Sequence, residues 1–438
     1  MERFFDVVVE WYYENSQGRM RRSGLRGPRE DRVSTKPIKV ATFNRNFFRA
    51  AGGAESYSVS IVEGLADRVG EDGRHEFEMH VFAQSFKPNH ARVIYHRVPG
   101  PIRRRWVNQI WYSFYCWWHT RNGFDGTHSH ENTWCGDVQT LHVRPVKYHL
   151  LEGLSGFRRF MRWVKIATSP RLLFYVWVEA SRHRSKPRRV VVAVSESMRE
   201  QTLRAFPACD PAMPIIPPGV SKPNLALSQS EAREVLSLPQ ECSIALFCGN
   251  DYARKGLGAL LEALAITQTT KPLHLVIVGS EAQRKRFEEQ AQALGVDTRV
   301  HFRGQVADIN VAYRACDLVV HPTLEDTFAM IVLEALNYGL PVIVSSAQYC
   351  GISALLRDGK EALVIEDPRD ARCIARKIEE ILDSASLREK LAEHGRAFAQ
   401  DRQWSRSVDA YADIFKKLSG RRDGSTSCCG GTSSRLAS

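Results

Sequence analysis

Two acidic side chains stand eight positions apart in the stretch 321–344. Asp326 ends a polar loop, and Glu334 follows it among apolar residues. The pattern predicts strand, loop, helix and strand, because Gly339 suits a left-handed helix end and Pro341 prevents continuation. Both carboxylates can then lie near one face of the helix and its preceding loop. Helix capping alone would explain Asp326, but Glu334 in apolar surroundings needs a buried donor or a ligand hydroxyl.

A basic pair, Arg254 and Lys255, follows a predicted strand that ends at Cys248. Cations placed there could neutralise the developing charge of a diphosphate leaving group. A solvated basic turn is the alternative. The flanking Gly249 and Gly256 favour the functional interpretation.

Two weaker constellations lie in the first half of the chain. Gly52 and Gly53 come between the first strand and its helix, so the backbone there can approach a phosphate, and Glu55 begins the helix. His128 and His130 are two positions apart and could bind a metal ion, but no third ligand is evident.

The elements that must position these side chains alternate between strands and helices. Short β-branched runs separated by helical segments indicate parallel sheets, and a proline-rich segment at 211–223 interrupts the alternation. The sequence therefore predicts an α/β protein with two doubly wound domains facing across a cleft, where ligands bind at the carboxyl ends of the strands. The predicted strands are Ile38–Phe43, Phe77–Phe82, Arg189–Val194, Ile244–Cys248, Leu273–Val278, Val300–Phe302, Leu318–His321 and Pro341–Ser345. The predicted helices are Ala54–Val69, Glu196–Phe206, Gly258–Ile266, Gln283–Leu294, Ile309–Ala315, Phe328–Tyr338 and Asp370–Leu382.

Composition bounds the partners without choosing among them. The formal net charge of +12 favours nucleic acid, phospholipid head groups or phosphorylated small molecules, and no nucleic-acid-binding module is evident. The 10 Cys residues show no zinc-site spacing. No apolar run reaches the ~20 residues of a membrane-spanning helix. We therefore expect a cytoplasmic protein with reduced thiols that is able to rest on a membrane surface.

The acidic segment 321–344 resembles the E-x7-E region of the retaining glycosyltransferases of family 4, which have the GT-B fold of two Rossmann-like domains. The resemblance covers nearly all of residues 38–418. It implies that Asp326 contacts the donor sugar and that Glu334 binds the ribose of the nucleotide. Asp326 stands where the family more often has Glu, and Glu325 could substitute for it in a shifted register.

The other constellations acquire roles from the same resemblance. It implies that His130 hydrogen-bonds the donor sugar and that His128 is structural. The family often has an Arg near the position of Asn250, and this chain does not. No metal and no cofactor is expected beyond the nucleotide-sugar substrate. The predicted donor-binding residues are Gly52, Gly53, Glu55, Arg254, Lys255, Gly279, Val306, Glu325, Phe328, Ala329 and Glu334.

The resemblance also assigns roles to the parts of the chain. The predicted division is a disordered leader at 1–36, an acceptor-binding Rossmann-like domain at 37–210, a linker at 211–223, a nucleotide-sugar-binding Rossmann-like domain at 224–402, a C-terminal helix at 403–419 that returns to the N-terminal domain, and a disordered tail at 420–438.

Within family 4 the chain looks closest to the lipopolysaccharide core glucosyltransferases. The similar stretches are Tyr252–Gly256, Glu179-Ala180 and Ile216–Val220. This similarity implies transfer of a hexose, glucose, from UDP-glucose with retention of configuration. The implied acceptor is a cell-envelope glycan or glycolipid, including phosphorylated ones, at the cytoplasmic face of the plasma membrane.

Two aromatic and basic stretches bear on the membrane. Arg103–Trp118 and Phe157–Trp163 place Arg beside Trp, Tyr and Phe, a combination that suits a lipid–water interface. An aromatic core helix with a basic end explains them nearly as well.

Other functions remain open at this stage. A nucleotide-sugar epimerase on the same fold would make a new nucleotide sugar without any acceptor. A membrane-surface binding protein that has lost activity would bind no donor, and Asp326 and Asn250 are the residues that favour it.

Overall fold

The computed structural model describes residues 36–100, 104–210 and 212–420. The chain from Pro37 onward forms one compact unit. The predicted leader and nearly all of the predicted tail lie outside the described residues, so both stay predictions.

The first sheet is parallel and has the order β5-β3-β1-β6-β7-β8. Strands β3 and β5 are added on one side of β1, and strands β6, β7 and β8 are added on the other side. The point where the direction reverses is the switch point, and it lies between β1 and β6. Its register pairs Ile38 with Phe77 and Val40 with Gly126. The strands are β1 (Ile38–Phe43), β3 (Phe77–Ala83), β5 (Val93–Arg97), β6 (Gly126–Ser129), β7 (Val138–Leu141) and β8 (Val190–Ala193).

The second sheet repeats this topology as β11-β10-β9-β12-β13-β14, again all parallel. Its switch point lies between β9 and β12. The expectation of two Rossmann-like parallel-sheet units is confirmed. The strands are β9 (Ser243–Cys248), β10 (Leu273–Val278), β11 (Val300–Gly304), β12 (Leu318–His321), β13 (Val342–Ser345) and β14 (Leu363–Ile365).

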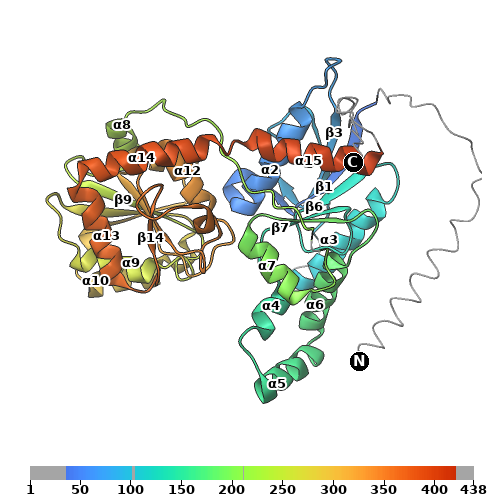
Figure 1. Ribbon diagram of the computed structural model, residues 1–438, viewed down its shortest axis with the longest axis horizontal. Coiled ribbons are helices and arrows are strands. Elements are labelled where there is room, and N and C mark those ends of the chain that lie inside the picture. The colour runs from blue at the N-terminus through green and yellow to red at the C-terminus, as the bar shows by residue number, and fades with distance from the viewer. Residues whose placement is uncertain (1–35, 101–103, 211, 421–438) are drawn as a thin grey trace, which may run out of the picture. The chain divides into compact units, whose positions relative to one another are not determined.

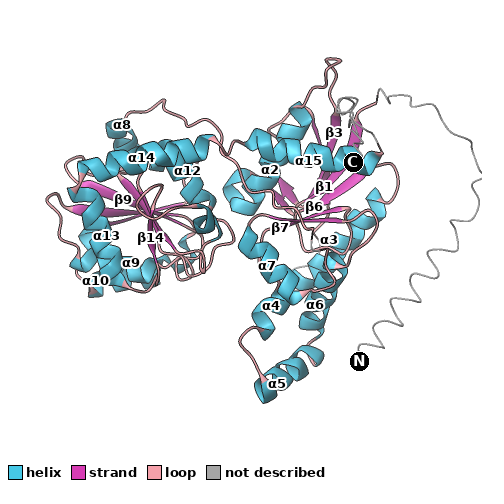
Figure 2. Cartoon of the chain, viewed as in Figure 1, coloured by secondary structure: helices cyan, strands magenta, loops and turns pink. Residues whose placement is uncertain are grey.

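Helices cover both faces of each sheet (Figure 1 and Figure 2). In β9, Ala245 and Phe247 join one core cluster while Ile244 and Leu246 join another, as the two-residue period of a strand requires. The helices of the first half are α2 (Gly53–Asp67), α3 (Arg105–Thr120), α4 (Val146–Leu151), α5 (Gly156–Ala167), α6 (Pro170–His183) and α7 (Glu196–Ala205). Those of the second half are α8 (Gln229–Val235), α9 (Leu257–Ile266), α10 (Arg284–Ala293), α11 (Ile309–Ala315), α12 (Met330–Tyr338), α13 (Ala371–Asp383), α14 (Ala385–Gln400) and α15 (Trp404–Ser419). Short elements complete the chain: β2 (Asn46–Phe47), β4 (Ser85–Phe86) and the 3-10 turns Arg49–Ala51, Glu281–Gln283, Asp297–Arg299 and Gly351–Leu355.

The last helix, α15, packs on the first sheet rather than on the second. It contacts α2, β1 and β6, and Figure 1 shows it alongside α2. The hydroxyl of Tyr411 lies 3.1 Å from the hydroxyl of Tyr57 and 2.6 Å from Oγ1 of Thr140. The end of the chain is thus bonded to the interior of its first half.

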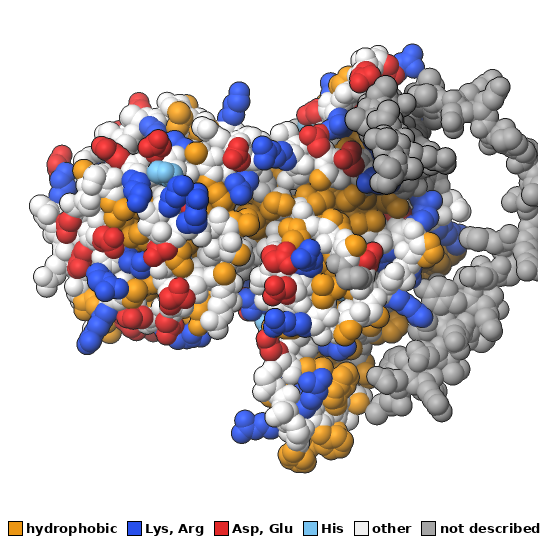
Figure 3. Space-filling view, viewed as in Figure 1, with side chains coloured by type: hydrophobic (Ala, Val, Ile, Leu, Met, Phe, Trp, Pro, Cys, Tyr) orange, Lys and Arg blue, Asp and Glu red, His pale blue; other side chains and the backbone are white. Residues whose placement is uncertain are grey.

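Helix α5 presents apolar side chains to solvent. Phe157 and Phe160 are 74% and 61% exposed, and Met161 and Trp163 are exposed as well. Figure 3 shows hydrophobic side chains gathered over this end of the first half, with basic ones beside them. Among the described residues, no helix is both long and apolar enough to cross a membrane.

Candidate functional site

The Asp326 carboxylate is the centre of the predicted acidic segment, in the loop between β12 and α12. Its Oδ2 lies 2.5 Å from Nζ of Lys255 and 3.1 Å from Nε2 of His321. Its Oδ1 accepts the backbone N–H groups of Phe328 and Ala329. Burial raises the pKa of Asp326, but the His321 hydrogen bond and the Lys255 charge lower it more, so the net pKa is below its usual value. Asp326 is therefore an ionised carboxylate that holds the Lys255 ammonium in place.

The second switch point brings together two loops. The basic loop follows β9 and carries Arg254 and Lys255, and the acidic loop follows β12 and carries Glu325 and Asp326. Lys255 Nζ also donates to the carbonyl of Glu325 at 3.1 Å, and the carbonyl of Arg254 accepts the N–H of Leu324. Gly256 has a φ of +80°, and a Cβ there would lie 1.9 Å from the carbonyl oxygen of Pro322. Glycine at this position allows the two loops to approach. The Arg254 side chain is half exposed beside Asp251.

The helix start differs from the prediction at Phe328. Helix α12 begins at Met330, because Ala329 has a φ of +71° and ends the loop in the left-handed region. A residue with a Cβ is strained there by about 1–2 kcal/mol. The side chains of Phe328 and Ala329 are buried, and their N–H groups already donate to Asp326.

The second acidic residue, Glu334, lies about one turn into α12, which begins at Met330. Tyr313 donates its hydroxyl proton to Glu334 Oε2 at 2.6 Å. Burial raises the pKa of Glu334, opposed by the Tyr313 hydrogen bond and by the charge of Arg49. Arg49 precedes the predicted glycine loop, and a Cβ on Gly53 would lie 3.6 Å from Sδ of Met330 at the start of α12. The glycine loop of the first half thus lies against the helix that carries Glu334.

Other predicted glycine and acidic positions have clear local contacts. Glu55 folds back toward Gly52, where a Cβ would lie 2.8 Å from Oε2 of Glu55. Gly279 ends β10, and a Cβ there would lie 2.0 Å from the carbonyl oxygen of Gly249. The backbone that follows β10 therefore passes close to the backbone that follows β9, which accounts for glycine at position 279 without a ligand.

His130 is a member of a buried histidine array at the ends of β6 and β7. Its Nδ1 lies 2.9 Å from Nε2 of His142, and the His128 ring lies 4.1 Å from it. Burial lowers the pKa of His128 and His142 to about 3 and lowers that of His130 as well. All three imidazoles are therefore neutral near pH 7. In the part of the chain that the structure describes, no three His, Cys, Asp or Glu side chains gather as a metal ion would need.

His142 is a site residue that the sequence analysis missed. Its backbone carbonyl accepts the hydroxyl of Thr327, which follows Asp326. The backbone of His142 is therefore bonded to the loop that carries Asp326. Its position directly after β7 could have indicated a site residue, because side chains at the carboxyl ends of parallel strands line ligand sites. The sequence analysis did not predict β7.

The predicted donor residue Glu325 also contacts the first half. Its Oε1 lies 3.7 Å from Nε of Arg144 and 3.4 Å from Nε2 of His149. The His149 hydrogen bond lowers the pKa of Glu325, and the same contact raises the pKa of His149. Ser195 adds a hydrogen bond to the carbonyl of Thr327 at 2.7 Å. The acidic loop is thus bonded to the ends of two strands in the first sheet.

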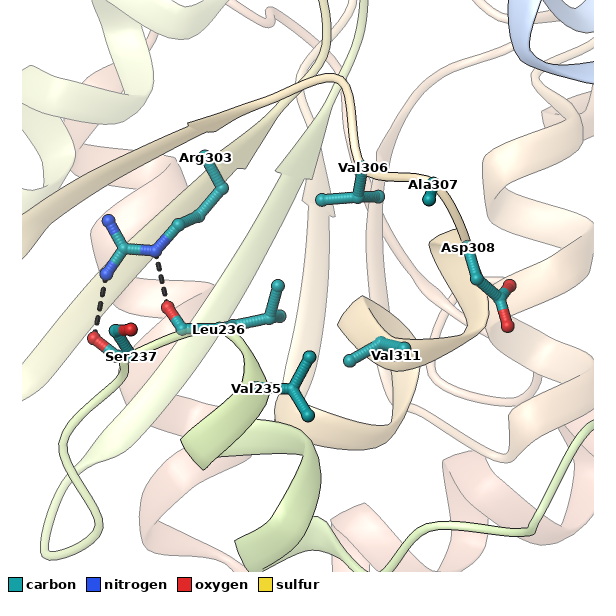
Figure 4. Close-up of a pocket in the computed structure, with 8 residues that line it drawn as sticks. All are labelled: Val235, Leu236, Ser237, Arg303, Val306, Ala307, Asp308 and Val311. Carbon is teal, nitrogen blue, oxygen red and sulfur yellow. Dashed lines mark hydrogen bonds between the residues drawn. The ribbon is translucent and has the colours of Figure 1, made fainter.

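Val306, predicted to lie in a base-binding loop, lines a separate pocket of about 550 Å³ (Figure 4). Val235, Val306 and Val311 turn toward the same space, and Arg303 bonds the carbonyls of Leu236 and Ser237 at one wall. This pocket shares no lining residue with the Lys255–Asp326 network. Its lining residues are Val235, Leu236, Ser237, Arg303, Val306, Ala307, Asp308 and Val311.

Comparisons with known proteins relate the second half of the chain to a described family. Residues 228–398 match the family described as Glycosyl transferases group 1. The lipopolysaccharide glucosyltransferase WaaG of Escherichia coli (strain K12) is 28% identical over 208 residues, which cover 46% of this chain and 55% of WaaG. The lipopolysaccharide core biosynthesis glycosyltransferase LpsE of Rhizobium meliloti (strain 1021) is 31% identical over 185 residues, which cover 42% of this chain and 52% of LpsE. The chain thus spans about half the length of the curated relatives it matches.

Solved structures extend the fold comparison over most of the chain. The crystal structure of WaaG, a glycosyltransferase involved in lipopolysaccharide biosynthesis, has a TM-score of 0.73 at 21% identity and covers 86% of this chain and 99% of that one. Anabaena HepE in complex with UDP-glucose has a TM-score of 0.66 at 17% identity, covering 87% of this chain and 100% of that one. The fold is GT-B, with two Rossmann-like parallel-sheet units. This chain carries a group 1 glycosyltransferase domain of the family 4 type and is related to the lipopolysaccharide core glucosyltransferases.

Proposed function

We propose that this protein is a retaining glycosyltransferase that transfers glucose from UDP-glucose to a cell-envelope saccharide of the lipopolysaccharide core type. The observation that carries the proposal is the Lys255–Asp326 ion pair at the switch point of the second sheet. The names of WaaG and LpsE support the acceptor class. The HepE complex supports the donor, since that structure holds UDP-glucose on the same fold.

In this proposal the C-terminal half binds the donor. Lys255 and Arg254 contact the diphosphate and stabilise the charge that develops as it leaves. Glu334 accepts hydrogen bonds from the ribose hydroxyls, and the Val306 loop contacts the nucleobase. No step requires a metal ion, because two cations already face the leaving group.

The donor sugar then lies between the acidic loop and the histidines. Asp326 and Glu325 accept hydrogen bonds from its hydroxyls, and the shorter Asp326 contributes mainly by fixing Lys255. The neutral pair His130 and His142 gives one imidazole N–H to the sugar, and the His142 backbone is bonded to the loop that carries Asp326. Attack from the face that the diphosphate leaves retains the anomeric configuration.

Helix α5 supports a peripheral position on the inner face of the plasma membrane. It carries Arg158, Arg159, Arg162 and Lys165 among the exposed aromatic residues. An amphipathic basic helix of this kind binds anionic lipid surfaces. A lipid-linked acceptor would then be presented to the first half of the chain.

Calorimetry with UDP-glucose, GDP-glucose and ADP-glucose tests the proposal directly. We expect the UDP sugar to bind most tightly and UDP to be released when a delipidated core oligosaccharide is added. Failure of all three donors to bind would favour an inactive binding protein. Formation of a new nucleotide sugar without acceptor would favour an epimerase.

A further inference from the structure

Two buried tyrosines pack beside the histidine array of the first half, Tyr57 on α2 and Tyr411 on α15. The centre of the Tyr57 ring lies 6.0 Å from that of His130 and 5.1 Å from that of His142. The centre of the Tyr411 ring lies 4.8 Å from that of His128. Each of the three imidazoles therefore has one of the two tyrosine rings as a neighbour.

The two tyrosine hydroxyls belong to a continuous chain of hydrogen bonds. The Tyr57 hydroxyl lies 2.9 Å from the carbonyl oxygen of Ile216 and 3.1 Å from the Tyr411 hydroxyl. The Tyr411 hydroxyl lies 2.6 Å from Oγ1 of Thr140, and that oxygen lies 2.8 Å from Nε2 of His128. The chain therefore runs from the backbone at Ile216 through the buried core to an imidazole.

Only one placement of the protons satisfies every contact in this hydroxyl chain. The Ile216 carbonyl can only accept, so the single hydroxyl proton of Tyr57 is donated to it. Tyr411 must then donate to Tyr57, and Thr140 must donate to Tyr411. The last contact is left for an N–H of the imidazole, which makes His128 the Nε2–H tautomer.

His128 has a single N–H with which to make this bond. Burial lowers the pKa of His128 to about 3, and the charges of His142 and Arg182 act in the same direction, so the ring is neutral near pH 7. Its Nδ1 is buried and has no hydrogen-bond partner among the described residues. The other tautomer would therefore leave a buried N–H without an acceptor and would also break the hydroxyl chain.

The buried guanidinium of Arg182, on α6, fixes the strand that carries Thr140. Its Nη2 donates to the backbone carbonyl of Thr140 at 2.6 Å, and its Nε donates to Oε1 of Gln139 at 2.9 Å. Strand β7 ends at Leu141, and His142 follows directly. The Thr140 hydroxyl is therefore held in place by a helix as well as by the sheet.

Tyr57 also contacts the two segments that connect the halves of the chain. Ile216 lies in the first connection, between β8 and α8, and the ring of Trp404 at the start of α15 lies 5.5 Å from the Tyr57 ring. The two connections are bonded to each other, because the Val220 N–H donates to the Arg402 carbonyl at 2.8 Å. The hydroxyl chain is thus anchored where the halves join.

From this geometry we infer that Tyr57 and Tyr411 are positioning residues for the histidines that contact the donor sugar. The hydroxyl chain fixes the tautomer and orientation of His128, whose ring centre lies 4.1 Å from that of His130. His130 shares a hydrogen bond with His142, so the orientation is passed to the imidazole pair. The inference rests on the proposed function, in which this pair donates an N–H to the sugar, and it deepens that function.

Long-range ¹H–¹⁵N NMR of the full chain, labelled with ¹⁵N-histidine, reads the tautomer of His128 directly. We expect the Nε2–H form between about pH 6 and pH 8, with the signal assigned by its absence from His128→Gln. Tyr411→Phe should add a population of the Nδ1–H form, because Thr140 is then able to donate to Nε2. Its kcat with UDP-glucose should fall about fivefold, the value of one hydrogen bond, with unchanged UDP affinity.

Conservative and distant variants separate positioning from a general loss of stability. Thr140→Ser keeps the hydroxyl and should keep the tautomer and kcat, whereas Thr140→Val should lose both. Tyr95→Phe is the matched control, because it removes a tyrosine hydroxyl that donates to Asn89 at an exposed place in the same half. If Tyr411→Phe does not fold, Tyr57→Phe breaks the hydroxyl chain at its other end.

An Nδ1–H tautomer of His128 in the wild type would overturn the inference, and that measurement requires no donor. So would an unchanged tautomer in Tyr411→Phe, a changed tautomer with unchanged kcat, or a joint fall of kcat and UDP affinity. Absence of transfer from UDP-glucose by the wild type would instead refute the proposed function.

Discussion

The two switch points have the same topology and different charged groups. At β9/β12 Lys255 meets the carboxylate of Asp326, which the Lys255 charge and a hydrogen bond to His321 keep ionised, and Arg254 lies beside Asp251. At β1/β6 Arg45 pairs with Glu131, and the buried guanidinium of Arg182 interacts with the same carboxylate, beside imidazoles that are neutral. In the proposed function, one strand order serves two ligand chemistries, an anionic leaving group in the second half and the acceptor in the first.

The largest effect is expected at the cationic switch point. Lys255→Ala should lower kcat/KM for UDP-glucose by about 10²–10³-fold, the usual loss for one preorganised electrostatic group. Steady-state kinetics would measure it, with Lys285→Ala on the exposed face of α10 as the control. A Lys255→Ala enzyme with wild-type kinetics would remove the contrast between the two halves.

Removal of the proposed ribose contact ranks second. Glu334→Ala should weaken UDP binding about tenfold to a hundredfold, because hydrogen bonds to a charged group are lost. Since burial raises the pKa of Glu334, wild-type affinity should fall as the pH drops through that raised value. Tyr313→Phe removes a hydrogen bond that lowers this pKa, so its affinity loss should begin at higher pH. Calorimetry across a pH series would show both effects, and coincident curves would contradict the role of Tyr313.

A smaller effect is expected at the neutral histidines of the first half. His142→Ala should lower kcat about tenfold with little change in UDP affinity, as one hydrogen bond to the sugar is lost. Because burial lowers the pKa of His142 to about 3, the wild-type kcat should show no titration of this imidazole above about pH 5. A change in the wild-type kcat near pH 6.5 that disappears in His142→Ala would show that this imidazole titrates.

The smallest effect concerns the strained position at the start of α12. Ala329→Gly should raise the free energy of unfolding by about 1 kcal/mol, because glycine adopts a φ of +71° without strain. Ala335→Gly, in the middle of the same helix, should lower it by at least a similar amount. Urea denaturation would measure the free energy of unfolding of both variants. If Ala329→Gly is no more stable than the wild type, the contact of this loop with Asp326 depends on the alanine.

Most of the second half could be predicted from the sequence, and much of the first half could not. Strands β9, β10 and β12 are continuous apolar runs, so their residues alone indicate buried parallel strands. Strand β6 is Gly126–Ser129, with one β-branched residue, and it forms because strands on both sides pair with it. Strand β14 has only three residues. These elements depend on neighbours distant in the sequence.

The site divides in the same manner. Asp326 and Lys255 lie in local motifs that follow recognisable strands, so their proximity could be expected. The partner of Glu334 could not, because Tyr313 lies on another helix. His142 was missed because β7 was missed. Ala329 gave no signal, since only its backbone angle shows that the helix begins at Met330, two residues later than predicted.

The C-terminal helix α15 has a consequence for how the protein is made. Tyr411 completes the hydrogen bonds of Tyr57 and Thr140 deep in the first half. During synthesis the first sheet is therefore without this cover until α15 has left the ribosome, which is after the strands of both sheets have been translated. A chain that terminates before residue 404 would expose the apolar interior of its first half to chaperones and proteases.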